Sequence, residues 1–157
     1  NMSEEEIDKI RISALLHDVG KIGIEDKILK KPGILTPDEF AIMKQHPQKG
    51  AAIARRVSQL REMVPGIELH HESLDGRGYP YGLRGSEIPR MAFIIAVADT
   101  FDAMTTHRPY QSAMDPAVAI DYILSFANKK FDPDVAKALE TAFQSGQLKM
   151  TRAATLV

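Results

Sequence analysis

The sequence predicts an all-α fold, a compact bundle of about six or seven helices. Apolar residues recur at helical spacing, as at Ile7, Ile10 and Ala14. Proline, glycine and capping residues separate the periodic segments, and neither sustained strand alternation nor a hairpin turn signal occurs. With 157 residues, of which 44% are hydrophobic, the chain can form one domain with a buried core. We therefore expect a single domain over residues 1–157.

The first helix begins at a capping box, in which the side chains of Ser3 and Glu6 can each bond to the other's backbone amide. Apolar residues at helical spacing follow it. The helix is expected to end near Gly20, because glycine commonly follows the last turn of a helix. This boundary puts His17 and Asp18 in the last turn.

The middle of the chain predicts three further helices and a loop. A second capping box, T-x-x-E, begins a helix over 36–46, and Pro47 fits the first position of another helix over 47–60. A short helix over 67–72 would carry two adjacent histidines. The stretch "LDGRGYPYGLRG" that follows contains four glycines and one proline between residues 75 and 85, so we expect an irregular loop there.

The last three helices each begin at a proline, which fits the first position of a helix. Two of these prolines directly follow an aspartate that can act as the N-cap. The three helices begin at Pro89, Pro116 and Pro133, and the last one ends at Gly146. Residues 147–157 follow no strong pattern and are expected to form a weakly structured tail.

The charge balance and the lack of cysteine narrow the classes of function. A formal net charge of -1 provides no bulk attraction to nucleic acid or to an anionic membrane, so an anionic substrate must be held locally. Without cysteine, a metal would have only nitrogen and oxygen ligands, which suits iron, manganese or zinc. The longest apolar run, 91–98, is too short to span a bilayer. The lack of cysteine is compatible with the cytoplasm.

Six potential metal ligands lie at spacings that indicate one metal-dependent phosphohydrolase site. Two of the groups are pairs of adjacent residues, His-Asp and His-His, which suit two neighbouring ions bridged by a carboxylate. The four segments fall on separate expected helices, so they can converge in one cavity of a bundle. The six candidates are His17, Asp18, His46, His70, His71 and Asp99.

Each candidate alone also has an ordinary structural explanation. His17 would interact favourably with the dipole at a helix C-terminus, and Asp99 could form a buried salt bridge. Asp18 is harder to explain, because it follows the apolar stretch "ISALL" and a buried carboxylate is costly unless it is paired or metal-bound. Lys21, three residues later, is either a cation at the helix end or a contact to a phosphate.

Four motifs, taken in order, resemble the HD-GYP family, a branch of the HD metal-dependent phosphohydrolase superfamily. They are "HDVGKI", "HP", "HHESLDGRGYP" and "VADTFDAMTTHRPY". The resemblance runs from Leu15 to Tyr110, and the flanking helices extend it over nearly the whole chain. It implies a helical phosphodiesterase that hydrolyses the bacterial second messenger cyclic di-GMP to pGpG, to GMP, or to both. It also implies attack by a hydroxide that bridges two divalent ions, iron or manganese, with zinc as an alternative.

The resemblance also implies a role for each matching residue. All six candidates match metal-ligand positions, and Asp18 matches the bridging carboxylate at the catalytic centre. Lys21 matches a catalytic lysine near the scissile phosphate. The substrate-binding positions implied in this way are Lys21, Gly78, Tyr79, Pro80, Asp102 and Arg108.

Two departures from the family pattern lead to further expectations. Family domains usually begin with another helix upstream of the His-Asp pair, which supplies a histidine and, in three-metal members, a glutamate. This chain begins at Asn1-Met2 and lacks that helix, so we expect a fragment with a two-metal site and reduced activity, and a third ion in the full-length protein. The position after "RPY" is often basic in the family but is Gln111 here, so one phosphate contact would be weaker.

The resemblance implies partners as well as a substrate. These are diguanylate cyclases of the GGDEF type and an upstream regulatory domain, with a location in the cytoplasm or in the cytoplasmic part of a larger sensor protein. Neither a nucleic acid partner nor a membrane segment is expected. Two other functions stay open: an HD-type hydrolase that acts on another nucleotide, and a catalytically silent module that binds the cyclic dinucleotide or a protein without cleaving either.

Overall fold

The computed structural model describes residues 2–107 and 112–148 of the chain. The described part is helical, as predicted, and contains no β-strand, only two isolated bridges. Its α-helices are α1 (Glu4–Leu16), α2 (Asp26–Leu29), α3 (Pro37–Met43), α4 (His46–Ala54), α5 (Val64–Leu69), α6 (Arg90–Thr105), α7 (Pro116–Ser125) and α8 (Pro133–Gln144). Three short 3₁₀ helices join them: η1 (Val19–Gly23), η2 (Ser58–Met63) and η3 (Gly85–Glu87).

Most helices begin where the sequence predicts. Both capping boxes form, at the starts of α1 and α3, and each satisfies backbone amides that a helix leaves free. Asp115 and Asp132 cap α7 and α8 by accepting hydrogen bonds from the first backbone amides of each helix. Each of the seven expected helices has a counterpart, and the four-residue helix α2 is an addition.

Four expected helices have wrong boundaries. The first ends at Leu16 and not near Gly20, and the helix expected over 36–46 ends at Met43. The helix expected over 47–60 ends at Ala54, because Val57 adopts an extended backbone with φ -107° and ψ 113°, and η2 follows. The helix expected over 67–72 begins earlier, at Val64, with Pro65 in its first turn, and it ends at Leu69. Pro65 was the available start signal for this helix.

The corrected boundaries put the candidate histidines at helix ends. His17 is the C-cap of α1, and Asp18 lies between α1 and η1 rather than in the last turn of the helix. His46 is the first residue of α4, shortly after α3 ends. His70 is the C-cap of α5, and His71 follows it. At such positions the backbone carbonyls of the preceding turn lack helical partners and can bind side chains.

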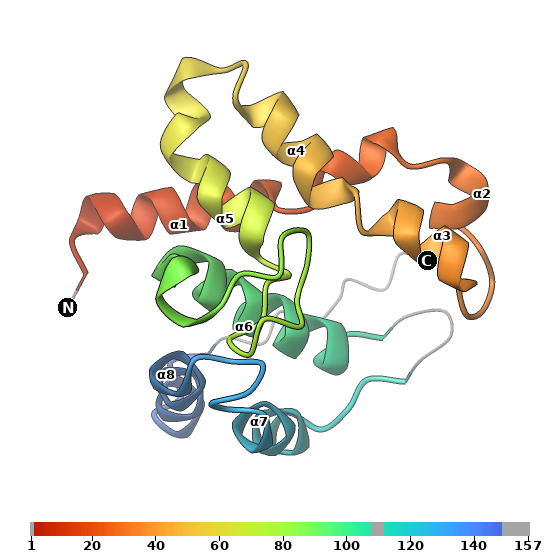
Figure 1. Ribbon diagram of the computed structural model, residues 1–157. Helices are drawn as coiled ribbons and strands as arrows, with labels where there is room; N and C mark the ends of the chain where they lie inside the picture. The colour runs from red at the N-terminus through yellow and green to blue at the C-terminus, as the bar shows by residue number, and fades with distance from the viewer. Residues whose placement is uncertain (1, 108–111, 149–157) are drawn as a thin grey trace, which may run out of the picture.

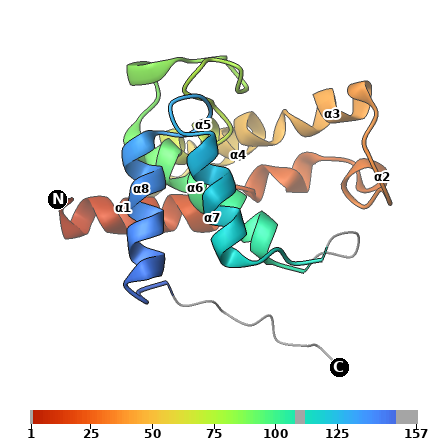
Figure 2. The ribbon, with the colours of Figure 1, turned by 90° about the horizontal axis from the view of Figure 1, so that it is seen from below.

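Helix α6 is the central element of the fold. Figure 1 shows it between α4 and α5 on one side and α7 and α8 on the other, with α2 and α3 together at one end. Figure 2 shows α7 and α8 side by side. The larger core lies between α6, α7 and α8, and the smaller one joins α4, α5 and η2 to α1. No helix in the described residues has the length and apolar composition needed to cross a bilayer.

Two glycines allow the closest contacts between helices. A Cβ atom on Gly20 would lie 1.9 Å from the carbonyl oxygen of His46 and 2.4 Å from the nitrogen of Gly50, so η1 packs directly against the start of α4. A Cβ atom on Gly66 would lie 2.8 Å from the Cβ atom of Ser13, where α5 crosses α1. These contacts bring the end of α1, the start of α4 and the end of α5 close together.

Candidate metal centre

The structure brings all six candidate metal ligands to one place. They come from the α1–η1 junction, the start of α4, the end of α5 and the middle of α6. Two overlapping triads have ligand atoms within 4.8 Å of one another: His17–Asp18–His70 and His46–His70–His71. Asp99 adjoins the first triad from α6. Because the triads share one histidine, the six residues form a single cluster.

Several nitrogen and oxygen atoms face one another in this cluster. Nε2 of His17 lies 3.3 Å from Oδ2 of Asp18 and 3.7 Å from Oδ1 of Asp99. Nε2 of His46 lies 3.2 Å from Oδ1 of Asp18. The same nitrogen lies 3.4 Å from Nε2 of His70. The two oxygens of Asp18 therefore face different histidines.

Local backbone orients three of the histidines. In each, Nδ1 lies within hydrogen-bond distance of the carbonyl oxygen three residues earlier, in the preceding helical turn. The pairs are His17 with Ala14 (2.7 Å), His46 with Met43 (2.8 Å) and His70 with Ile67 (2.8 Å). A carbonyl only accepts, so each Nδ1 carries the hydrogen, and in a neutral ring Nε2 offers a lone pair. Metal-binding histidines are commonly oriented in this way.

The donor set fits a divalent metal ion. Among the described residues, two buried side-chain atoms lack a hydrogen-bond partner, namely Nε2 of His17 and Oδ1 of Asp18. In addition, Nε2 of His46 and Nε2 of His70 face each other although both rings donate through Nδ1. Such buried groups are costly unless a metal cation satisfies them or, at His17, a proton that faces the two carboxylates.

Burial and neighbouring charges separate the pKa values of the histidines. Interaction with Asp18, and then with Asp99, raises the pKa of His17 to about 10, so this ring is protonated at neutral pH without a metal. Burial lowers the pKa of His70 to about 4 and that of His71 to about 3. Both of these rings are therefore neutral and can donate lone pairs at neutral pH.

The two carboxylates of the cluster are ionised despite their surroundings. Burial raises the pKa of Asp18, but interactions with its neighbours outweigh burial and hold the pKa well below its usual range. Those neighbours are His17, His46 and Lys21. Burial opposes ionisation of Asp99 too, and interaction with His17 outweighs it, so the pKa of Asp99 is lowered. Both side chains are available as anionic ligands.

The loop that carries Tyr79 is held against the cluster by Glu72. This glutamate is 3% exposed, and it accepts three hydrogen bonds from backbone amides. The donors are Tyr81 (2.7 Å), Gly82 (3.2 Å) and Leu83 (3.0 Å). The ring of Tyr79 stacks on His71 with 4.7 Å between centroids, and the peptide bond between Tyr79 and Pro80 is cis. Gly78 is needed because a Cβ atom there would lie 2.3 Å from the backbone nitrogen of Ser73.

Glu72→Gln is expected to loosen this loop. The neutral amide accepts more weakly than the carboxylate, and its NH₂ group faces backbone N–H groups that need an acceptor. We expect the free energy of unfolding to fall by about 1.5–3 kcal/mol, as for the loss of hydrogen bonds to a charged group. Chemical denaturation measures this fall. Glu62→Gln, on an exposed side chain, is the control, and an equal small change in both variants would contradict the role of Glu72.

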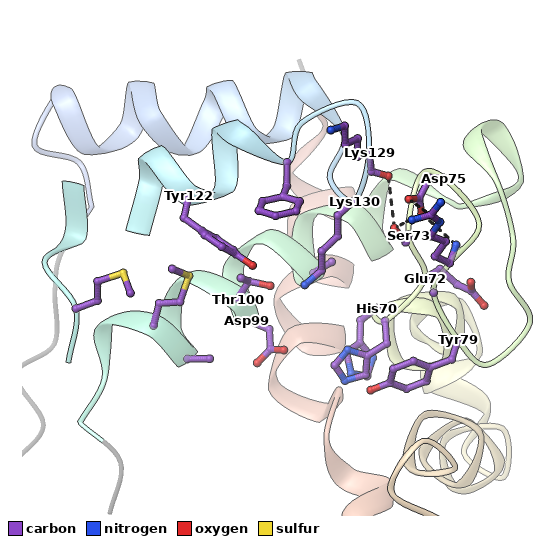
Figure 3. Close-up of a pocket in the computed structure, with 18 residues that line it drawn as sticks. His70, Glu72, Ser73, Asp75, Tyr79, Asp99, Thr100, Tyr122, Lys129 and Lys130 are labelled. Atoms are coloured by element: carbon purple, nitrogen blue, oxygen red, sulfur yellow. Dashed lines mark hydrogen bonds and ion pairs between the residues drawn. The ribbon is translucent and has the colours of Figure 1, made fainter. Parts of the chain in front are cut away.

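A cavity of about 880 Å³ lies beside the cluster. Figure 3 shows His70, Tyr79 and Asp99 along one side, with Tyr122 and Lys130 facing them. Two of the expected substrate contacts, Gly78 and Tyr79, belong to the cavity wall, whereas Pro80 follows them without lining it. A third, Lys21, does not line the cavity, and its Nζ donates to Oδ2 of Asp18 at 2.5 Å.

Of the two remaining expected substrate contacts, Asp102 does not line the cavity and Arg108 cannot be placed relative to it. Asp102 is exposed on α6, where its carboxylate accepts a hydrogen bond from the hydroxyl of Thr106 at 3.2 Å, and it does not line the cavity. Arg108 and Gln111 lie outside the described residues.

Three residues near the site were missed in the sequence. Glu72 stands directly after the histidine pair, a position that would have suggested it, but its partners follow nine to eleven residues later. Lys44 places its Nζ 4.8 Å from the ring centroid of Phe40 and 5.8 Å from that of Tyr79. Lys130 reaches the cavity from the loop after α7, and nothing in its local sequence indicates this.

Comparison with known protein families agrees with the ligand cluster, the helical fold and the order of the motifs. The model of the HD domain family matches residues 1–135. The chain belongs to the HD domain family. The HD-GYP resemblance found in the motifs of this HD domain is confirmed by its relatives.

Two curated relatives of this HD domain carry a named activity. One is the "Cyclic di-GMP phosphodiesterase" of Thermotoga maritima, which is 49% identical over 139 residues, an alignment that covers 87% of this chain and 38% of the relative. The other is the "Cyclic di-GMP phosphodiesterase response regulator RpfG" of Xanthomonas campestris pv. campestris, which is 45% identical over 141 residues. That alignment covers 88% of this chain and 37% of the relative. The HD domain thus spans under two fifths of each relative's length.

A solved structure shares the fold. It is that of a cyclic GMP-AMP specific phosphodiesterase from V. cholerae, with a TM-score of 0.72 and 18% sequence identity. The match covers 94% of this HD domain and 40% of the other chain. At this identity the likeness shows a common fold for the two domains.

Proposed function

We propose that this HD domain is a metal-dependent phosphodiesterase that hydrolyses cyclic di-GMP to pGpG, to GMP, or to both. The observation that carries this assignment is the cluster of imidazole and carboxylate donors beside a cavity, with two buried donor atoms left without partners. The names of the two curated relatives support cyclic di-GMP as the substrate. Hydrolysis of a phosphate diester is a reaction that such nitrogen and oxygen sites support.

The six clustered residues would hold two divalent ions, iron or manganese, with zinc as an alternative and a third ion in the full-length protein. Bound ions supply an activated water and neutralise charge on the phosphate. The neutral rings of His70 and His71 offer lone pairs without first losing a proton. The two oxygens of Asp18 face different histidines, so this carboxylate would be shared between the ligand groups of His17 and His46.

Lys21 and Tyr79 have distinct parts in this assignment. The ammonium of Lys21, which is held by Asp18, would neutralise a phosphate oxygen as charge develops in the transition state. Tyr79 stacks on His71 at the edge of the cavity, where it can pack against a base or position a phosphate. Burial raises the pKa of Tyr79, so its hydroxyl is neutral and can donate a hydrogen bond.

Lys21→Ala is expected to retain the metal ions and to lower kcat by about 10²-fold, the usual effect of removing one electrostatic contact to the transition state. Metal content and steady-state rates measure the two quantities separately. Lys27→Ala, at an exposed lysine paired with Glu25, is the control. Loss of metal in Lys21→Ala would mean that this lysine instead keeps Asp18 in place.

The proposed function is tested by turnover under anaerobic conditions with added iron(II) or manganese(II). The substrates are cyclic di-GMP, another cyclic dinucleotide and a linear dinucleotide. Faster hydrolysis of cyclic di-GMP is the expected result. Faster hydrolysis of a different nucleotide would favour the broader HD-type hydrolase. Binding of cyclic di-GMP without hydrolysis in metal-replete protein would favour a silent module.

The same proposal extends to the protein's surroundings. Its partners would be diguanylate cyclases of the GGDEF type and an upstream regulatory domain. Its location would be the cytoplasm, where it would encounter the nucleotide. Co-purification of the full-length protein with such a cyclase tests the first of these.

A further inference from the structure

The loop between α7 and α8 is hydrogen-bonded to residues 74 and 75, which follow the histidine pair. The backbone amide of Asp75 donates to the carbonyl of Lys129 at 2.8 Å, and the amide of Leu74 donates to the carbonyl of Lys130 at 3.2 Å. Asn128, with a φ of 63°, makes the turn that precedes these two lysines. The loop therefore presents Lys130 to the cavity from a backbone that is held in place.

The side chain of Lys130 faces the cluster of candidate metal ligands across the cavity. Figure 3 shows it directed toward Thr100 and Asp99, whereas the neighbouring Lys129 side chain is directed away from them. Within the described residues, no carboxylate lies at ion-pair distance from the ammonium of Lys130. Partial burial lowers the pKa of Lys130, and the charge of Asp99 opposes that shift. A cation without an acidic partner thus lines the cavity.

The same wall offers an apolar surface next to this cation. The rings of Tyr122 and Phe126 lie 4.8 Å apart by centroid, and both line the cavity together with Met104 and Met114. Aromatic side chains are common stacking surfaces for nucleotide bases. A volume of about 880 Å³ lies within the usual range for small-molecule sites and exceeds the needs of one phosphate group.

Two lysines near the cluster, Lys21 and Lys130, lie beside different carboxylates. Lys21 bonds to Asp18, and Lys130 faces Asp99. With divalent ions bound by the six candidate ligands, the cluster would repel the ammonium of Lys130 unless an anion lay nearby. A substrate with two phosphates supplies one anion for the reaction centre and a second one for the cavity wall.

We propose that Lys130 is a substrate-binding residue that holds the phosphate of the dinucleotide that is not being cleaved. This role depends on the proposed function and makes it more specific. A ligand with two phosphates gains the contact to Lys130, and a diester with one phosphate does not. Lys130 therefore contributes to the preference of the HD domain for dinucleotides over simple phosphate diesters.

The test compares two substrates, cyclic di-GMP and bis(4-nitrophenyl) phosphate, a diester with a single phosphate. In Lys130→Met, the ratio of kcat/KM for cyclic di-GMP to that for bis(4-nitrophenyl) phosphate is expected to fall about tenfold, the size of one charge-assisted hydrogen bond. Lys130→Arg should restore most of the ratio, because it restores the charge. Lys129→Met is the matched control and should leave the ratio unchanged.

Equilibrium binding gives a second readout that needs no turnover. The Kd of cyclic di-GMP for the EDTA-treated protein, measured by calorimetry, should rise about tenfold in Lys130→Met. Circular dichroism and thermal unfolding check that each variant is folded. An unchanged ratio and Kd would overturn the role of Lys130. An equal fall for both substrates would also overturn it, since Lys130 would then act on the metal cluster.

The proposed function is tested separately, by the activity of the unmodified protein on the same two substrates. Hydrolysis of bis(4-nitrophenyl) phosphate without hydrolysis of cyclic di-GMP would count against cyclic di-GMP as the substrate. In that case the calorimetric comparison of Lys130→Met with Lys129→Met still decides whether Lys130 binds the dinucleotide.

Discussion

Asp18→Ala is expected to abolish metal binding and turnover together, with a fall in kcat of at least about 10³-fold. The carboxylate faces His46 through Oδ1 and His17 through Oδ2, and it also holds Lys21. Its removal would take away the anion that faces both His17, in one triad, and His46, in the other. Metal content by mass spectrometry and steady-state turnover of cyclic di-GMP measure the two effects on the same sample.

The matched control for this change is Asp121→Ala, at an exposed aspartate on α7. It should retain both metal and activity. Turnover that persists in Asp18→Ala would exclude a bridging role for this carboxylate. Retention of metal with loss of turnover would assign Asp18 a role in catalysis but not in holding the ions.

Gly20→Ala should destabilise the protein by about 2–4 kcal/mol and lower its Tm by roughly 5–15 °C. The added Cβ atom would lie 1.9 Å from the carbonyl oxygen of His46 and 2.4 Å from the nitrogen of Gly50. Both are backbone atoms, so η1 and α4 must move apart. That movement separates Asp18 from His46, and metal affinity should fall along with stability.

Gly23→Ala, in the same 3₁₀ helix, provides the comparison. The nearest atom to a Cβ there is Cδ of Lys49 at 3.1 Å, which belongs to a flexible side chain that can move. Calorimetric unfolding should show a small change for this variant. Equal losses of stability in both variants would indicate that the cost comes from helix propensity or the unfolded state, and not from the contact of η1 with α4.

Features set by neighbouring residues were predicted well from the sequence. Ser3 with Glu6 marks the start of α1, because the partners in a capping box are only three residues apart. The candidate ligands were found from short motifs, and the structure brings them together. The early end of α4 was missed, because the extended backbone at Val57 follows no strong local signal.

Features that depend on distant contacts could not be read from the sequence. Glu72 follows the histidine pair directly, but its role arises from burial and from amides that the loop returns to it. Lys130 reaches the cavity only because the loop after α7 is bonded to residues 74 and 75, far earlier in the chain. Asp102 lies three residues from Asp99 in sequence but does not line the cavity, and its expected contact with the substrate stays a prediction.

The bonds from three imidazole Nδ1 atoms to carbonyls of the preceding turn have an evolutionary consequence. Each ring takes its direction from its own helix end, whereas the distances between rings depend on how the helices pack. These two properties can change independently during divergence. If the six residues bind metal ions as proposed, a shift of α5 relative to α1 would alter the ionic radius that the cluster accepts, while every ring still presented the same nitrogen. Metal preference would then drift among descendants through core substitutions that leave all six proposed donor residues in place.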